Sequence, residues 1–289
     1  DLTALADYYS NGSYGLRLES SYALRYKFRG NFSFRYEKLI NSQRGFPDFS
    51  EGSIYNIRWS HRQDQKSSPN SSFSASVNLG SSQYYQESTN MSNAGNRLTN
   101  TLSSSVSYSK TWPGDQQFNL SLTATHSQNT NTQSITMTLP TLQASMDRIY
   151  PFEPKIGAKK GLIENINLQY NLRAENRFNT TDSLFFQPEM FEDAGLGAQH
   201  SIPLSTNFKL FNYLSVSANT TYNENWVFKT FERRYDEELQ QEVVDTISGF
   251  DSSRTYNFNT SIGTPLYGTV NFKPDSKIQA VRHVMRPSI

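Results

Sequence analysis

The feature that most constrains this chain is a strict alternation of apolar and small polar residues. Between Phe118 and Thr125 the sequence reads F-N-L-S-L-T-A-T, with apolar side chains at even positions and Asn, Ser or Thr at odd positions. Successive side chains of a β-strand point to opposite faces. The segment therefore predicts a strand with one apolar face and one polar face.

The same alternation recurs along nearly the whole chain and predicts about thirteen strands. Many of these segments run for about 9 to 14 residues, the length a tilted strand needs to cross a bilayer, whereas strands of soluble proteins average about 5 or 6. The clearest segments are Tyr14–Tyr22, Phe28–Glu37, Tyr55–Arg62, Phe73–Tyr84, Leu98–Lys110, Phe118–Gln128, Ser134–Leu139, Asn165–Arg177, Leu196–Phe208, Leu214–Phe228 and Ser252–Leu266.

Charged residues fall mostly on the polar side of these segments. In Asn165–Glu175 every even position is apolar and every odd position is polar or charged. Only 35% of the chain is apolar and its mean hydropathy is −0.66, which is low for a packed soluble sandwich. A sheet with hydrocarbon on one side and water on the other accounts for both observations. We predict an all-β fold, a transmembrane antiparallel β-barrel of which residues 1–289 form one partial domain.

The connections between these segments alternate in length, as in outer-membrane barrels, which have short periplasmic turns and long outer loops. The segment Asp147–Glu164 is an exception, a long connection on the side of the short turns. The predicted short turns are Ala23–Lys27, Trp112–Gln116, Leu210–Tyr213 and Pro265–Gly268, and the predicted long loops are Ile40–Ile54, Gln86–Arg97, Asn179–Gly195 and Tyr235–Ser248.

Bulk properties narrow the classes of partner. With a net charge of +1, the chain is not expected to bind nucleic acid. The absence of cysteine excludes disulfides and thiolate metal sites within this stretch. The chain contains no run of about 18 apolar residues, so the sequence predicts no transmembrane helix. The chain starts at Asp1 and stops at Ile289 as a strand begins, so we expect an internal fragment of a longer protein.

The sequence offers no catalytic, metal-binding or cofactor-binding constellation. The four histidines, His61, His126, His200 and His283, lie far apart in unrelated contexts. There is no G-x-S-x-G elbow and no glycine-rich phosphate loop. We therefore expect no enzymatic activity and no cofactor. An outer-membrane lipase using a His–Ser pair on neighbouring strands is the enzymatic alternative.

Two charged groups and one aromatic group are candidates for other roles. The acidic residues between Glu232 and Asp245 predict either a divalent-cation site or a solvated loop tip, ragged or helical. Lys229, Arg233 and Arg234 are candidates for contact with lipid phosphates. Residues expected to anchor strand ends at the membrane interfaces are Trp59, Trp112, Trp226, Tyr84, Tyr85, Tyr108 and Phe231.

Several stretches together resemble the LptD-type proteins, which are outer-membrane lipopolysaccharide assembly proteins, in the form found in Bacteroidota. The resemblance covers most of the chain and consists of long-range patterns rather than a compact motif. Its stretches are Asp1–Ala4, Tyr8–Gly15, Ile57–His61, Ser68–Ser76, Thr101–Gly114, Arg148–Phe152 and Arg282–Ile289.

This resemblance implies a very large barrel plugged by a lipoprotein of the LptE kind, with the present chain as the first half of the barrel. A periplasmic jelly roll would precede it and receive lipopolysaccharide from the components of a periplasmic bridge. The first and last strands would part as a lateral gate through which lipopolysaccharide reaches the membrane lipids of the outer leaflet. The gate strand would carry Leu2, Ala4, Ala6 and Tyr8.

The chain departs from the family pattern in two respects. Some relatives carry prolines that loosen the first two strands, whereas Leu2–Tyr22 contains none. Some relatives join barrel and jelly roll by disulfides, for which this chain has no cysteine.

Two alternatives share part of the sequence pattern. A channel or nutrient-transporter barrel in the outer membrane would show the same polar face. A β-solenoid adhesin would require a fixed repeat period, which this sequence lacks.

Overall fold

This computed structural model describes residues 1–89, 100–157, 159, 161–211, 213–238, 240–273 and 277–287. The predicted loop Gln86–Arg97 therefore lies partly outside the described residues. The chain divides into two compact units, one comprising residues 1–144, 173–198 and 227–251 and the other comprising residues 145–172, 199–226 and 252–289.

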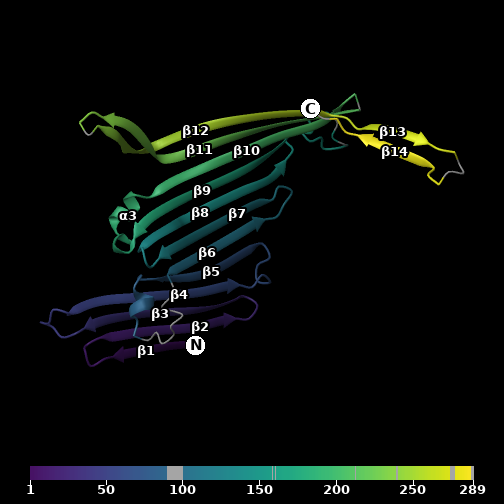
Figure 1. Ribbon diagram of the computed structural model, residues 1–289. Coiled ribbons are helices and arrows are strands. Elements are labelled where there is room, and N and C mark those ends of the chain that lie inside the picture. The colour runs from purple at the N-terminus through teal and green to yellow at the C-terminus, as the bar shows by residue number, and fades with distance from the viewer. Residues whose placement is uncertain are drawn as a thin grey trace. The chain divides into compact units, whose positions relative to one another are not determined.

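Twelve strands follow one another as neighbours in a single sheet, in the order β1 to β12, and two further strands pair separately (Figure 1). The sheet contains β1 (Leu2–Tyr8), β2 (Tyr14–Leu24), β3 (Phe28–Asn41), β4 (Ser50–Gln63), β5 (Ser71–Gly80), β6 (Thr101–Trp112), β7 (Phe118–Asn129), β8 (Ser134–Ile149), β9 (Asn167–Thr181), β10 (Gly195–Leu210), β11 (Leu214–Asp236) and β12 (Gln241–Gly263). The separate pair is β13 (Leu266–Asn271) and β14 (Ala280–Met285).

The pairing register keeps each kind of side chain on one face of the sheet from β2 to β7. Residues directly opposite one another on neighbouring strands share a face, so each run of opposed residues forms a row across the sheet. The polar row is Ser21, Asn31, Ser60, Ser76, Ser105 and Thr125. The apolar row beside it is Tyr22, Gly30, His61, Ala75, Val106 and Ala124. The faces that carry these rows are called here the wet face and the apolar face.

Most of the apolar side chains are not packed into a core. The accessible surface is 20287 Å², whereas a compact monomer of this mass, 33.0 kDa, exposes about 12,500 Å². Leu16, Leu18 and Leu122 on the apolar face remain 39–48% exposed. Such a face requires a surrounding apolar medium, in agreement with the predicted transmembrane barrel.

Aromatic rings gather on the apolar face near the short-turn ends of β2 to β5. The indole of Trp59 donates a hydrogen bond to the hydroxyl of Tyr22 (2.7 Å), and that hydroxyl also bonds Nδ1 of His61 (2.9 Å). The rings of Phe28 and Phe73 contact the same group. Glycine is required beneath it at Gly30, because an added Cβ would lie 2.5 Å from the backbone oxygen of Ser60. Anchoring at the interface, expected for Trp59, stays a prediction.

Strands continue into two of the predicted loops, so the loop Ile40–Ile54 is shorter than predicted, with residues 42–49 as the connection, and the loop Tyr235–Ser248 is wrong. The β3–β4 ladder extends to the pair Asn41 and Ser50. The β11–β12 hairpin turns only between Asp236 and Gln241, so the acidic segment is a strand-paired arm and not a helical or ragged tip. Side chains pair across both hairpins, Asn41 with Ser50 (3.2 Å) and Arg234 with Asp245 (2.7 Å), and this cross-strand pairing extends the ladders where composition alone suggested a loop.

The segment after β12 also departs from expectation. The predicted turn Pro265–Gly268 contains the start of β13, and β13 pairs with β14 instead of returning along β12. The long connection predicted over Asp147–Glu164 is confirmed, since β8 ends at Ile149 and β9 begins at Asn167. Among the described residues, no helix has the length and apolarity to cross a membrane.

Candidate functional site

The candidate gate strand β1 forms one edge of the sheet, where it pairs with β2. Leu2, Ala4, Ala6 and Tyr8 all lie on one face of it, opposite Ser20, Leu18, Leu16 and Tyr14 in turn. All four are exposed, Leu2 to 75% and Tyr8 to 80%. The structure therefore places the four predicted residues together on an accessible edge strand, and their role in a gate stays a prediction.

A segment after β5 folds back over the wet face beside this edge. It comprises residues 81–89 and includes the short helix α1 (Tyr84–Glu87). We call it the cap. Its anchor is Glu37 of β3, a residue that is 1% exposed. One carboxylate oxygen of Glu37 accepts a hydrogen bond from the Ser88 hydroxyl (2.7 Å), and the other accepts bonds from the Thr89 amide (3.0 Å) and hydroxyl (3.1 Å).

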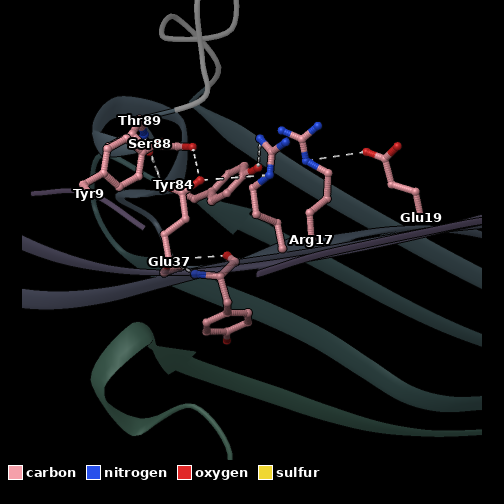
Figure 2. Close-up of polar contacts among 10 residues, drawn as sticks. Tyr9, Arg17, Glu19, Glu37, Tyr84, Ser88 and Thr89 are labelled. Carbon is pink, nitrogen blue, oxygen red and sulfur yellow. Dashed lines mark hydrogen bonds and ion pairs between the residues drawn. The ribbon is translucent and has the colours of Figure 1, made fainter. Parts of the chain in front are cut away.

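The same contacts connect the cap to the end of β1. The Tyr9 hydroxyl lies 3.2 Å from the Thr89 hydroxyl, directly after the candidate gate strand. Figure 2 shows Ser88 and Thr89 at the carboxylate of Glu37 and Tyr9 beside Thr89. A guanidinium also faces this carboxylate, since Nε of Arg35 lies 4.0 Å from Glu37. The cap, β3 and the start of the chain are therefore joined through one buried carboxylate.

The aromatic residues of the cap are buried, so the prediction that Tyr84 and Tyr85 anchor a strand end at the membrane interface is wrong. The two residues are 3% and 2% exposed, and their rings meet edge to face with centroids 5.2 Å apart. Arg35 donates a hydrogen bond to the Tyr84 hydroxyl (3.2 Å), and Arg58 donates one to the Tyr85 hydroxyl (2.7 Å). Burial raises the pKa of the Tyr84 phenol, while the Arg35 guanidinium opposes that shift. The apolar residues packed with the two tyrosines are Leu39, Ile54 and Leu102.

A second connection contacts the cap through a polar junction. It follows β9 and contains η1 (Asp182–Leu184) and α3 (Pro188–Glu192). The Asp182 carboxylate accepts hydrogen bonds from the Ser82 amide (2.9 Å) and from the Gln128 side chain (2.7 Å). Gln128 also donates to the Ser82 hydroxyl (3.1 Å). This junction fixes residues 81–89 at the end opposite Glu37.

The sequence reading did not identify Glu37, Asp182 or the cap. Glu37 ends an alternating segment and Ser88 and Thr89 fall in a polar stretch, so nothing local distinguishes them from solvated residues. A signal existed in Leu39 and Ile54, which are apolar residues at positions that alternation assigns to the wet face. Apolar side chains on that face require a cover.

The three basic residues predicted to contact lipid phosphates do not form one patch. Lys229 donates to the backbone carbonyl of Glu192. Arg234 pairs with Asp245 (2.7 Å) and with Asp236 (3.5 Å). Arg233 is exposed and points to the opposite face from Arg234, because neighbouring strand residues alternate.

The acidic and histidine residues are not gathered into a metal site among the described residues. His61 bonds Tyr22, His126 lies 3.4 Å from the Ser104 hydroxyl, and His200 bonds Tyr170 (2.8 Å). Each of these three histidines therefore has a hydroxyl partner within its own sheet region, as expected for residues with structural roles.

Comparisons with known proteins bear on the whole chain. The family model described as LptD protein matches residues 1–289. No curated protein matches the chain. A solved structure, the ferric yersiniabactin uptake receptor FyuA from Yersinia pestis, is 11% identical with a TM-score of 0.29, and the alignment covers 97% of this chain and 49% of the receptor. The chain thus spans about half the length of that receptor.

The family match confirms the predicted resemblance and, with the sheet described above, the predicted fold class and outer-membrane location. It also confirms that the chain is not an enzyme, because the family is one of transport and assembly proteins. The chain belongs to the LptD family of outer-membrane β-barrel proteins.

Proposed function

We propose that this chain is part of an outer-membrane translocon that inserts lipopolysaccharide into the outer leaflet. The wet face lines a hydrated lumen, and β1 is one lip of a lateral gate. Lipopolysaccharide is an amphiphile with a sugar headgroup, so its route needs a hydrated, weakly charged passage beside a hydrocarbon exit. Family membership supports the substrate class.

The observation that carries this proposal is the pair of rows across β2 to β7. The polar row contains six residues with hydroxyl or amide side chains and no charge, and the apolar row lies one residue nearer the short-turn end of each strand. Hydroxyls also bond each other across this face, as in Ser74 with Ser107 (2.8 Å) and Ser72 with Ser109 (2.9 Å). Neutral hydroxyl surfaces hydrogen-bond sugars without holding them as tightly as charged groups would.

The proposal includes the partners and the remaining parts of the protein. The full barrel holds a plug lipoprotein of the LptE kind, and components of a periplasmic bridge deliver the lipid. Residues 1–289 form one barrel domain together with later strands. Arg233 contacts lipid phosphates at the outer rim, because it is exposed on the arm, while Lys229 and Arg234 already have partners within the protein.

The test is site-specific photo-cross-linking in cells that produce the full-length protein. Benzoylphenylalanine replaces Ser76 of the polar row, Ala75 of the apolar row or Ala4 of β1. We expect lipopolysaccharide adducts at Ser76 and Ala4 and none at Ala75. Adducts of equal strength at Ser76 and Ala75 would contradict the assigned faces.

Native mass spectrometry of the purified full-length protein supplies the second test. Bound lipopolysaccharide and a co-purifying lipoprotein should both be detected in mild detergent. Ion conductance without a plug, together with growth defects tied to one nutrient, would instead identify a channel or nutrient transporter.

A further inference from the structure

Two arginines face each other on the wet face of β3 and β4 near the short-turn ends. Arg29 and Arg62 are directly opposed in the ladder, and both are exposed. Like charges directly opposite one another on adjacent strands destabilise a sheet. In the described part of the chain, no ion pair joins either guanidinium to a carboxylate.

A second opposed arginine pair on the same face differs in this respect. Arg17 and Arg35 are also directly opposed, on β2 and β3. Nε of Arg17 lies 3.9 Å from Glu19, and Nε of Arg35 lies 4.0 Å from Glu37. Each guanidinium of that pair has an acidic neighbour on its own strand. The pair Arg29 and Arg62 is therefore the one whose repulsion the fold leaves uncompensated.

Both unpaired arginines line an open cavity of about 1500 Å³ on this end of the sheet. The polar wet-face side chains around them are neutral donors, namely Ser21, Asn31, Ser60, Ser72 and Ser74, and Ala23 lies opposite Arg29. The other charged groups in the lining are Arg25, Asp1 and Asp64. One carboxylate oxygen of Asp64 already accepts the Lys66 amide (3.0 Å), and the Arg25 guanidinium lies over the Tyr26 ring.

We propose that Arg29 and Arg62 form a binding site for a phosphate group carried by the transported lipid. Guanidinium groups present planar forks of N–H donors that match phosphate oxygens, and one anion between two such forks removes their mutual repulsion. The serine hydroxyls and the Asn31 amide supply further donors. The identity of the phosphate carrier rests on the proposed function, whereas the phosphate chemistry rests on the arginine pair itself.

The site lies at the end of the wet face where the short turns are, since Arg29 follows the turn before β3 and Arg62 precedes the turn after β4. Short turns are periplasmic in outer-membrane barrels. The site therefore lies where a lipid headgroup enters the lumen, and the neutral polar row lies beyond it along the strands.

The experiment measures binding to the full-length protein, purified in detergent and freed of lipid, by isothermal titration calorimetry. The probes are sodium pyrophosphate, a diphosphorylated glycolipid and the same glycolipid after dephosphorylation. The variants are Arg29→Gln with Arg62→Gln, and Arg29→Lys with Arg62→Lys. The control is Arg44→Gln, in the turn of the same hairpin at its opposite end and 80% exposed at its side chain.

We expect the wild-type protein to bind pyrophosphate and to prefer the phosphorylated glycolipid over the dephosphorylated form by at least tenfold. The double glutamine variant should lose that preference, the double lysine variant should retain part of it, and Arg44→Gln should equal the wild type. Salt should weaken the binding, as for exposed charges. The double lysine variant keeps both charges, so it still tests the site if the double glutamine variant does not fold.

Equal affinity of the wild-type and double glutamine proteins for the phosphorylated glycolipid would overturn the site. A wild-type protein that does not distinguish the two glycolipids and does not bind pyrophosphate would overturn it too. Pyrophosphate binding that requires both arginines, without any gain for the glycolipid, supports a site for free phosphate. That result is independent of whether photo-cross-linking shows lipopolysaccharide on the polar row. The phosphate site and the translocon function can therefore be refuted separately.

Discussion

The β3–β4 hairpin and the arm of the β11–β12 hairpin, residues 227–251, carry similar charges in opposite surroundings. In the first, Glu37 is buried beneath the cap and accepts three hydrogen bonds. In the second, Arg234 pairs with Asp245 in solvent, where the two side chains are 56% and 48% exposed. A buried carboxylate that loses its partners costs free energy, whereas an exposed ion pair contributes little. The two hairpins therefore show that burial beneath another segment, and not charge by itself, decides which charged residues contribute to stability.

Strand length explains why the charges of the arm are solvated. Each strand of the arm belongs to an element of 23 residues, about 76 Å long at 3.3 Å per residue. Crossing a bilayer takes only about 9–11 residues of a tilted strand. The rest of β11 and β12 extends past the hydrocarbon, where charges remain hydrated.

The largest expected effect comes from placing a charge on the apolar face of the sheet, in comparison with the wet face and the arm. Leu122→Arg on the apolar face of β7 should reduce assembly, because a charge in hydrocarbon costs about 2–4 kcal/mol. Thr123→Arg on the wet face and Phe231→Arg on the arm should assemble normally. The measurement is the fraction of heat-modifiable barrel in outer membranes. Equal loss at Leu122 and Phe231 would remove the distinction between the two regions.

A steric change tests the packed part of the sheet. Gly30→Ala should destabilise the protein by about 2 kcal/mol, because its Cβ would press on the Ser60 backbone oxygen and on the Tyr22 hydroxyl. Gly249→Ala in the arm meets no atom within 4 Å and serves as the contrasting variant, although its φ of +158° makes some backbone strain unavoidable. Denaturant unfolding in detergent compares them, and an equal loss of stability would refute the packing argument.

The third prediction concerns the anchor of the cap. Glu37→Gln keeps the side chain's shape and removes its charge, so the bonds from Ser88 and Thr89 should weaken by about 1 kcal/mol in total. Amides of residues 81–89 should exchange hydrogen faster by about fivefold. The control is Glu51→Gln, which removes an exposed carboxylate 2.8 Å from Lys38 on the same hairpin. Unchanged exchange in Glu37→Gln would show that the buried tyrosines and the junction with Asp182 hold the cap without help from Glu37.

The smallest expected effect lies in the arm. A double-mutant cycle of Arg234→Ala and Asp245→Ala should give a coupling energy below about 1 kcal/mol, because both side chains are solvated. The hydrogen bond to Asp245 raises the pKa of Arg234, so this guanidinium stays charged at any physiological pH. A coupling well above that value would mean that the arm is covered in the membrane, in contrast with the exposed arm seen here.

Much of the sheet was predictable from alternation. Strands such as Phe118–Asn129 and Thr101–Trp112 match the predicted segments closely, since their side-chain period of two decides both the element and its face. The hairpin ends were not predictable, because Asn41 and Ser50, or the acidic residues of the arm, pair only when the partner strand is in place. Tyr84 and Tyr85 were misassigned because a tyrosine near a strand end has the same local sequence whether it faces lipid or lies beneath a cap.

The sequence by itself determined the class of the protein, because a period of two with hydroxyl and amide side chains on one face is a local property that needs no contact to be read. Tertiary structure alone decided where residues 81–89 fold, which carboxylate holds them, and which arginines face each other without an acidic neighbour. These features depend on pairs far apart in the chain, such as Glu37 with Ser88 and Ser82 with Asp182. Whether a charged or polar group is buried depends on the distant segment that packs over it, and the local sequence around the group does not reveal that segment.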